Sequence, residues 1–361
     1  MKLRKYLQNI FKKFFRKFFL ILYGKIKIDN KLNKNTHDKV IIKKIRNFSF
    51  NKDIYQVKGG RIYTDTVEHV AIIKNNTIMP HISFQQVLGE LKKTEFNKVL
   101  QIGTPRFLKK FDGQVLSLVQ GASGQNYFHF LFDVIGKLII CEKIIPLDTI
   151  NYFYIHEKIN WQIKILSLLG INESKLISSK KYRHIKADNI IAIEHPWYLD
   201  GFIQNQIANL PEWLIIELRE KFLRFAEKFD CNVNVFIDRS DSNYNHSKLR
   251  NNGEVIEYLT KKGFTSYQVS KLNFFEQIYL FNNAKVIIGP HGAAFSNIIF
   301  SKPETKIIEL IAEDHPSVKC QRISKILNLH YTRIKVAKVF SSNDVPGDME
   351  IQIKEIDDII D

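Results

Sequence analysis

Residues 285–310 read KVIIGPHGAAFSNIIFSKPETKIIEL, two β-branched apolar runs separated by a turn of small residues that holds one histidine. The runs predict two buried strands with a short helix between them. Gly289 and Gly292 permit a sharp turn and a close approach of the backbone to a ligand. A phosphate would be attracted by the free N–H groups at the helix start, those of Gly292, Ala293 and Ala294, with His291 as a further donor. A turn packed tightly for structural reasons would have a similar sequence.

The chain from residue 230 onward alternates strand and helix patterns joined by short links. This alternation predicts a doubly wound parallel sheet, in which ligands bind at the carboxyl ends of the strands. Before residue 230 the pattern is less regular. Short apolar runs continue to about residue 118, with one helix predicted over 83–93, and further helices are predicted from residue 127 and over 211–229.

Residues 1–28 hold nine Lys or Arg and no acid. At helical spacing their Phe, Leu and Ile residues share one face, and the longest apolar run is six residues, far below the roughly 20 needed to cross a bilayer. This pattern predicts a helix at the surface of an anionic membrane, although the same face could pack on the protein's own core. A linker is predicted over 29–37. The three widely spaced cysteines form neither a disulfide framework nor a metal motif and favour a reducing compartment.

Three further polar groups accompany the glycine-containing turn. His129 and Asp133 lie four residues apart in GASGQNYFHFLFDVIGKL, on one face of a predicted helix, and could act together in a site. The alternative is that the helix is merely capped and the two side chains form a solvated ion pair. Arg239 follows a predicted strand in FIDRSDSNYNHSKLR, as a phosphate clamp or a surface ion pair would. Glu309 ends the strand after the turn. Its carboxylate could bind a pair of ribose hydroxyls, or it could simply be solvated at the strand end.

In this order, the segments resemble glycosyltransferase family 61 over about residues 120–310, and in particular its bacterial capsular polysaccharide type. The resemblance is carried by NYFHFLFD, by IDRSDS and most specifically by FFEQIYLFNNAKVIIGPHGAAFSNIIF. The chain departs from the family pattern at three places. Gly136-Lys137 replaces a common Pro-Arg pair, Phe130 replaces a tryptophan, and Lys248 or Arg250 stands in for a second arginine.

The resemblance implies an α/β, GT-B-like fold, two Rossmann-like domains facing across a cleft, here with an N-terminal amphipathic helix. It also implies an inverting transfer of a sugar from a nucleotide-sugar donor, with no metal and no other cofactor; the chain lacks a D-x-D triplet. The expected parts are a membrane-surface helix (1–28), an acceptor-side domain (29–229) and a nucleotide-sugar-binding domain (230–361). The predicted donor-binding residues are Arg239, Ser240, Lys248, Arg250, Glu276, Gly289, His291, Gly292, Ala293, Ala294, Asn297 and Glu309.

Such a transfer needs a base for the acceptor hydroxyl and positive or dipolar groups for the leaving diphosphate. His129 and Asp133 are both candidates for the base, and the sequence leaves the choice open. We expect His291, Arg239 and the backbone of the turn to stabilise the leaving group. Glu276 could bind the donor or serve the structure of its helix.

The predicted function is hexosyl or pentosyl transfer to a glycan or lipid-linked glycan acceptor in surface polysaccharide synthesis, in the form of capsule, exopolysaccharide or lipopolysaccharide. The expected location is cytoplasmic, peripheral on the inner face of the cell membrane. An inactive scaffold of a polysaccharide assembly is the alternative. A basic nucleic-acid-binding protein is less favoured, because removing residues 1–28 lowers the net charge from +17 to +8.

Overall fold

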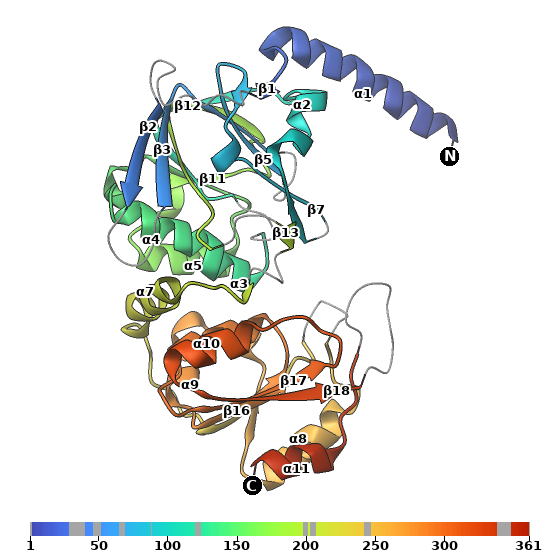
Figure 1. The fold of residues 1–361 in the computed structure, drawn as a ribbon, viewed down its shortest axis with the longest axis vertical. Helices are drawn as coiled ribbons and strands as arrows, with labels where there is room; N and C mark the ends of the chain where they lie inside the picture. The colour runs from blue at the N-terminus through green and yellow to red at the C-terminus, as the bar shows by residue number, and fades with distance from the viewer. Residues whose placement is uncertain are drawn as a thin grey trace. The chain divides into compact units, whose positions relative to one another are not determined.

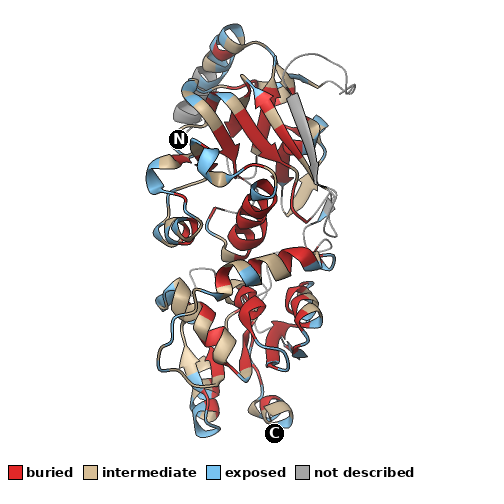
Figure 2. Ribbon diagram, turned by 90° about the vertical axis from the view of Figure 1, so that its left-hand side faces the viewer, coloured by how far each residue is buried: buried red, intermediate tan, exposed pale blue. Residues whose placement is uncertain are grey.

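The structure, a computed structural model, describes residues 2–28, 40–45, 52–64, 69–87, 89–119, 124–197, 201–202, 207–241, 247–337 and 348–360. It divides into two compact units, Met1–Gln206 and Ile207–Asp361 (Figure 1). The linker predicted over 29–37 lies outside the described residues. In each unit the central strands carry mostly buried residues (Figure 2).

Unit 1 is built on one large sheet. Its helices are α1 (Lys2–Tyr23), α2 (Val99–Ile102), α3 (Tyr127–His129), the π-helix η3 (Phe130–Ile135), α4 (Gly136–Glu142) and α5 (Asn160–Leu168). Its strands are β1 (Lys27–Ile28), β2 (Val40–Ile45), β3 (Lys52–Lys58), β4 (Arg61–Thr64), β5 (His69–Lys74), β6 (Thr77–Ile78), β7 (Phe84–Val87), β8 (Glu90–Lys92), β9 (Lys109–Ser117), β10 (Tyr152–Ile155), β11 (Leu176–Ser178), β12 (His184–Ile193) and β13 (Gly201–Phe202). Short 3₁₀ turns occur at Pro80–Ile82, Thr94–Phe96, Leu147–Thr149 and Glu173–Lys175.

The sheet of unit 1 is mixed, with the strand order β11-β10-β9-β12-β4-β5-β7-β8-β13 in the described residues. Strands β9 to β12 are parallel, and helices connect β9 to β10 and β10 to β11. The strands β3, β4, β5, β7 and β8 pair antiparallel. Only part of this unit therefore has the parallel pairing of a Rossmann-like domain.

Tight turns explain the antiparallel part. Asn75 and Asn76 both have positive φ, 46° and 58°, and join β5 to β6 in a two-residue hairpin. Gly89, with φ 77°, helps to join β7 to β8. A link this short cannot make the crossover that a parallel pair needs. The helix predicted over 83–93 is therefore wrong, because this segment forms the β7–β8 hairpin.

Helix α1 is anchored near its end. Phe19 is buried and packs edge-on against Phe107, with 5.0 Å between the ring centroids. The Tyr23 hydroxyl accepts a hydrogen bond from Leu108 N at 3.0 Å. Phe14 and Ile21 are 67% and 87% exposed. One side of the helix thus packs on unit 1 and another presents apolar side chains to solvent. Within the described residues, no helix combines the length and apolar character needed to span a bilayer.

Unit 2 is a doubly wound parallel sheet. Its strands are β14 (Asn234–Ile237), β15 (Thr265–Tyr267), β16 (Val286–Pro290), β17 (Lys306–Ala312) and β18 (His330–Val336). Its helices are α7 (Glu212–Leu223), α8 (Asn252–Lys261), α9 (Phe274–Asn283), the 3₁₀ helix η7 (Ala293–Phe300), α10 (Lys319–Leu327) and α11 (Ile353–Ile360), with a 3₁₀ turn at Val269–Lys271. Helices α8 and α11 share a core with one face of the sheet, and α9 and α10 lie on the other (Figure 1). Every strand and helix predicted between residues 230 and 336 is present.

Helix α7 belongs to unit 2 in the structure, although the sequence placed residues 211–229 in the preceding domain. Its apolar face is buried, and Arg219 Nη1 donates to the carbonyls of Ile299 and Ser301, at 2.7 Å each. The Arg322 side chain of α10 also donates to Leu210 O, just before the helix. The boundary between the units therefore lies before α7, at residue 207, and not near residue 230, where the regular strand pattern begins.

The strand order of unit 2, β15-β14-β16-β17-β18, reverses direction between β14 and β16. In such sheets the loops that leave the two strands at this switch point diverge and open a crevice for a ligand. Arg239 follows β14 and His291 follows β16. The topology therefore puts two predicted donor-binding residues at the expected ligand position.

Candidate functional site

The glycine loop, residues 289–294, is held by two cations. Arg239 Nη1 donates to the carbonyl of His291, and the buried Lys319 Nζ donates to the carbonyl of Gly292 at 2.7 Å. Helix η7 begins at Ala293, and its first bond runs from Phe295 N to Gly292 O at 3.2 Å. The N–H groups of Gly292, Ala293 and Ala294 precede that bond and have no acceptor within the helix. Two positive charges and three N–H groups thus meet at one turn.

The two glycines of the loop are required for different reasons. A Cβ at Gly292 would overlap the Arg239 guanidinium, so the arginine could not keep its position. A Cβ at Gly289 would lie 2.8 Å from the Ile237 carbonyl oxygen of the neighbouring strand β14. Gly289 therefore allows β14 and β16 to pair closely, whereas Gly292 leaves room for the cation beside the helix start.

Arg239 keeps its charge in this position. Burial lowers the pKa of its guanidinium to about 10, and Asp241 opposes that shift. The group is therefore protonated at neutral pH. Its planar fork carries several donors and suits two phosphate oxygens better than an ammonium does.

His291 is oriented by Glu309. The imidazole Nδ1 donates to Glu309 Oε1 at 2.5 Å, and the carboxylate is 1% exposed. Burial by itself would raise the pKa of Glu309, but the electrostatic effect of His291 and the hydrogen bonds from His291, Cys320 and Tyr331 outweigh it and lower the pKa to about 2. Burial lowers the pKa of His291, against the effect of Glu309. The imidazole is thus neutral at neutral pH, with Nδ1 protonated and Nε2 as an acceptor.

Two consequences follow for the sequence-based assignments of this pair. Glu309 was predicted to bind ribose hydroxyls, yet its oxygens already accept from His291, from Tyr331 OH at 2.6 Å and from Cys320 Sγ at 2.9 Å. His291 was predicted to donate a hydrogen bond to phosphate. Its Nε2 can donate only after the imidazole takes up a proton. Glu309 thus lies behind the site and positions the histidine.

Sequence reasoning missed Lys319, Cys320 and Tyr331. Lys319 and Cys320 resemble an ordinary helix start. Tyr331 pairs in register with Ile307, two residues before Glu309 on the same face of the sheet, so a known register would have placed it beside the carboxylate.

One group of possible metal ligands exists among the described residues. Donor atoms of His291, Glu309 and Cys320 lie within 4.8 Å of one another. Burial and Glu309 raise the pKa of the Cys320 thiol well above its usual value, so it remains protonated and donates to the carboxylate. Lys319 and Arg239 add positive charge close by. The trio fits a hydrogen-bonded carboxylate better than a divalent cation.

The loop after β14 is organised by Asp238, which the sequence analysis did not single out. Its carboxylate accepts from Ser240 N and Ser240 Oγ at 2.8 Å, from Gln268 Nε2 at 2.9 Å and from Asn252 Nδ2 at 3.0 Å. The predicted donor-binding residue Ser240 therefore gives its hydroxyl proton to Asp238. This network fixes the backbone on either side of Arg239.

The remaining predicted donor-binding residues make other contacts in the structure. Lys248 and Arg250 flank Leu249, and their backbones pair with Met349. Glu276 completes a capping box with Asn273 at the start of α9. Asn297 is fully buried and donates to Gln277 at 3.0 Å, which ties η7 to α9. For Glu276 and Asn297, the structure shows a local structural role.

Unit 1 contains a second histidine–carboxylate pair. His129 Nδ1 donates to Asp133 Oδ2 at 2.9 Å, and Asn126 caps the helix by accepting from His129 N. The pair lies in the α3–η3 segment, and π-helical turns often occur at functional sites. Asp133 is 0% exposed, so it is not the solvated ion pair that the sequence also allowed. His129 is 8% exposed and keeps Nε2 for another partner.

Asp133 is enclosed by residues that follow β12, the parallel neighbour of β9. Trp197 Nε1 donates to Asp133 Oδ1 at 2.6 Å, and His195 Nε2 lies 3.7 Å from Oδ2. Burial by itself would raise the pKa of Asp133, but the two histidines outweigh it and lower the pKa. Burial lowers the pKa of His195 to about 4 and that of the nearby Lys137 to about 7. No sequence spacing links residues 133 and 197, and this contact went unpredicted.

The His129–Asp133 pair and His291 lie within the range of a known family. The model described as Glycosyltransferase 61 matches residues 127–308, half of the chain. The chain belongs to glycosyltransferase family 61. The family range begins two residues before His129 and ends one residue before Glu309, so the family 61 region contains the His129–Asp133 pair, Arg239 and the glycine loop. Lys319 and Tyr331 lie beyond it. Membership identifies the chain as a glycosyltransferase.

The other comparisons add nothing to this assignment. No curated protein matches the chain. Among solved structures, 17 chains match. One is a mutant of the flavo di-iron protein from Thermotoga maritima, with 10% sequence identity, a TM-score of 0.24, and coverage of 89% of this chain and 98% of that chain. A similarity at this level carries no argument about fold or function.

Proposed function

We propose that this family 61 enzyme is an inverting glycosyltransferase that binds the diphosphate of a nucleotide sugar at the glycine loop of unit 2. The observation that carries the proposal is the convergence of Arg239, Lys319 and the N–H groups of residues 292–294 at the switch point of a doubly wound sheet. Fixed dipoles and cations of this kind stabilise the charge that develops on a leaving diphosphate.

His129 is the base in this proposal, rather than Asp133. The buried Asp133 has both oxygens engaged and cannot reach an acceptor, but it holds His129 Nδ1 as the protonated nitrogen. The Nε2 lone pair then accepts the proton of an acceptor hydroxyl. Asp133 positions the ring and stabilises the imidazolium once it forms.

In the reaction, the acceptor oxygen attacks the anomeric carbon as its proton passes to His129 Nε2. The bond between the anomeric carbon and the diphosphate breaks, and its electron pair stays on the phosphate oxygen, which faces the glycine loop. Attack opposite the leaving group inverts the configuration. The step requires the two units to meet, and we propose the GT-B arrangement for this. No step in this scheme uses a metal.

The acceptor we propose is a glycan or lipid-linked glycan of a surface polysaccharide, such as capsule, exopolysaccharide or lipopolysaccharide. The exposed apolar residues of α1 and the nine Lys or Arg among residues 1–28 support peripheral binding to the inner face of the cell membrane.

The experiment is a thermal-shift screen of the purified chain against a panel of nucleotide sugars, followed by a transfer assay. We expect one donor to raise the melting temperature, and His129→Asn to bind that donor as wild type does while transfer is lost. His129→Asn with wild-type turnover would refute the assignment of the base. If no donor is bound or hydrolysed, an inactive scaffold is the better description.

A further inference from the structure

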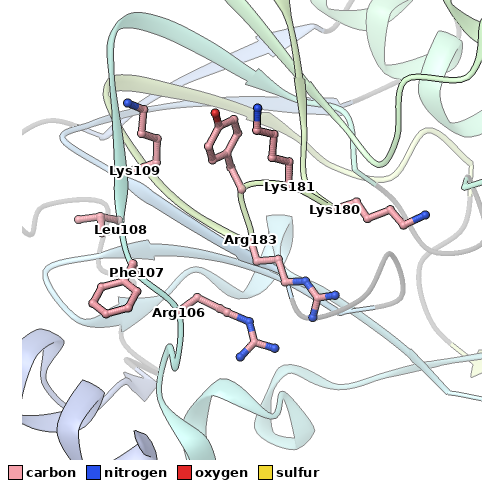
Figure 3. A pocket seen from close by; sticks show the side chains of 8 residues that line it. Arg106, Phe107, Leu108, Lys109, Lys180, Lys181 and Arg183 are labelled. Carbon is pink, nitrogen blue, oxygen red and sulfur yellow. The ribbon is translucent and has the colours of Figure 1, made fainter.

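A basic hollow lies at the opposite edge of the unit 1 sheet from His129. It has a volume of about 640 Å³ and is lined by Arg106, Phe107, Leu108, Lys109, Lys180, Lys181, Tyr182 and Arg183 (Figure 3). These residues precede β9 and β12 or begin β9, at the amino ends of the two strands. The nine residues of β9 span about 30 Å, so the hollow is separate from the His129 centre at the carboxyl ends.

The hollow continues toward α1. A second hollow, of about 460 Å³, shares Arg106 and Arg183 with the first, and its other lining residues are Lys12, Phe15, Arg16, Phe19, Ile102 and Pro105. Among the described residues, none that lines either hollow is acidic. Lys180 pairs with Glu157 at 2.9 Å. The cations that line the two hollows come from three separate segments, and this concentration of charge favours a phosphate ligand.

The backbone beneath the two shared arginines is fixed by buried groups. The carbonyl of Arg106 accepts from His184 Nδ1 at 3.0 Å, and the carbonyl of Arg183 accepts from Thr64 N at 2.9 Å. Next to them, Tyr154 OH donates to Tyr182 O at 2.6 Å. His184, Thr64 and Tyr154 are all buried. The arginines therefore project from a rigid base, and Figure 3 shows them side by side.

Apolar side chains flank this cationic surface. Phe107, on the rim, is 70% exposed although it contacts Phe19 of α1. Phe14, Phe18 and Ile21 form an exposed stripe at helical spacing on α1, the same helix that contributes Arg16 to the second hollow. Exposed aromatic and aliphatic groups beside cations suit the boundary between phosphate headgroups and acyl chains.

We propose that this hollow binds the phosphate headgroup of an anionic membrane lipid, while Phe107 and the stripe on α1 enter the acyl boundary. The site extends membrane contact beyond residues 1–28 to the amino edge of the sheet. The proposal does not depend on the sugar-transfer reaction. A single-stranded nucleic acid is the rival polyanion, but the most exposed side chain of the stripe, the aliphatic Ile21 at 87%, offers it neither charge nor a stacking surface.

The test is co-sedimentation of the full chain with vesicles of phosphatidylcholine, with and without phosphatidylglycerol. The double variant Arg106→Gln/Arg183→Gln removes two cations, and we expect its partition onto phosphatidylglycerol vesicles to fall roughly 25-fold, about fivefold per charge. Lys164→Gln removes one charge from the exposed side of α5 and serves as the control, with partition near that of wild type. An unchanged thermal melt shows that each variant is folded.

A second pair of substitutions, Lys109→Gln/Lys181→Gln, uses exposed side chains and should give a loss in the same direction. Wild-type partition of either folded double variant overturns the proposal. So does a loss that is equal on vesicles of phosphatidylcholine alone, because it would not depend on the headgroup charge. Tight binding of oligouridylate that the arginine variant abolishes, with vesicle binding intact, would assign the site to nucleic acid instead.

Discussion

Replacing Glu309 by glutamine tests the buried His291–Glu309 interaction behind the proposed donor site. The substitution keeps the size of the side chain and removes its charge. Lowering the pKa of this carboxyl from 4.5 to about 2 corresponds to about 3 kcal/mol of folding free energy at neutral pH. We expect Glu309→Gln to lose roughly that amount, because a neutral amide holds His291 and Tyr331 less strongly.

The pH dependence of this effect has a definite sign. The folded-state pKa lies below the unfolded value, so the stabilisation is fully present above pH 4.5 and is lost as the pH falls toward 2. Urea unfolding followed by circular dichroism should therefore show a large difference between wild type and Glu309→Gln at neutral pH and a shrinking difference below pH 4.5.

Glu304→Gln is the matched control. Glu304 also bonds a histidine, His330, at 2.5 Å, but both side chains are 63% exposed, so this substitution should cost less than about 1 kcal/mol. A Glu309→Gln protein within about 0.5 kcal/mol of wild type at neutral pH would refute the reasoning. A difference that stays constant down to pH 2 would do so equally.

Two further predictions concern the half-buried Arg239 and the buried Lys137. Arg239→Ala should weaken binding of the donor's nucleoside diphosphate by about 1.5–3 kcal/mol in calorimetry, since a charged hydrogen bond is lost, and an unaltered affinity contradicts its phosphate role. The buried Lys137, with a pKa of about 7 against 10.5 in the unfolded chain, binds fewer protons when folded, so wild-type stability should rise between pH 7 and 10.5. Lys137→Met should remove that slope and be the more stable protein at pH 7; parallel stability curves would refute this.

Much of unit 2 could be predicted from sequence, and the reason is physical. Strands buried on both faces have continuous β-branched runs, and short helices separate them, as in residues 285–310. Helix η7 and strand β18 have the bounds that the pattern predicted. In unit 1 the pairing of strands depends on turns such as Asn75-Asn76 and Gly89, and an apolar run does not reveal whether its partner is parallel or antiparallel.

The candidate site could be predicted only where local chemistry marks it. Gly292 and His291 stand out because small residues and a histidine interrupt an apolar run. The carboxylate of Glu309 was noticed, but its role was not, because that role depends on Cys320 and Tyr331 from two other elements. Trp197 lies 64 positions from Asp133, and no period or motif connects them.

The central claim, that the glycine loop binds the donor diphosphate, is tested most directly by titrating Gly292→Val with that nucleoside diphosphate in a calorimeter. The added side chain would overlap the Arg239 guanidinium. Gly253→Val is the control, since a Cβ at Gly253 in α8 has no neighbour within 4 Å. We predict that Gly292→Val folds, as circular dichroism will show, and has no measurable affinity, while Gly253→Val binds like wild type. A folded Gly292→Val protein that binds the nucleoside diphosphate with wild-type affinity would contradict the account.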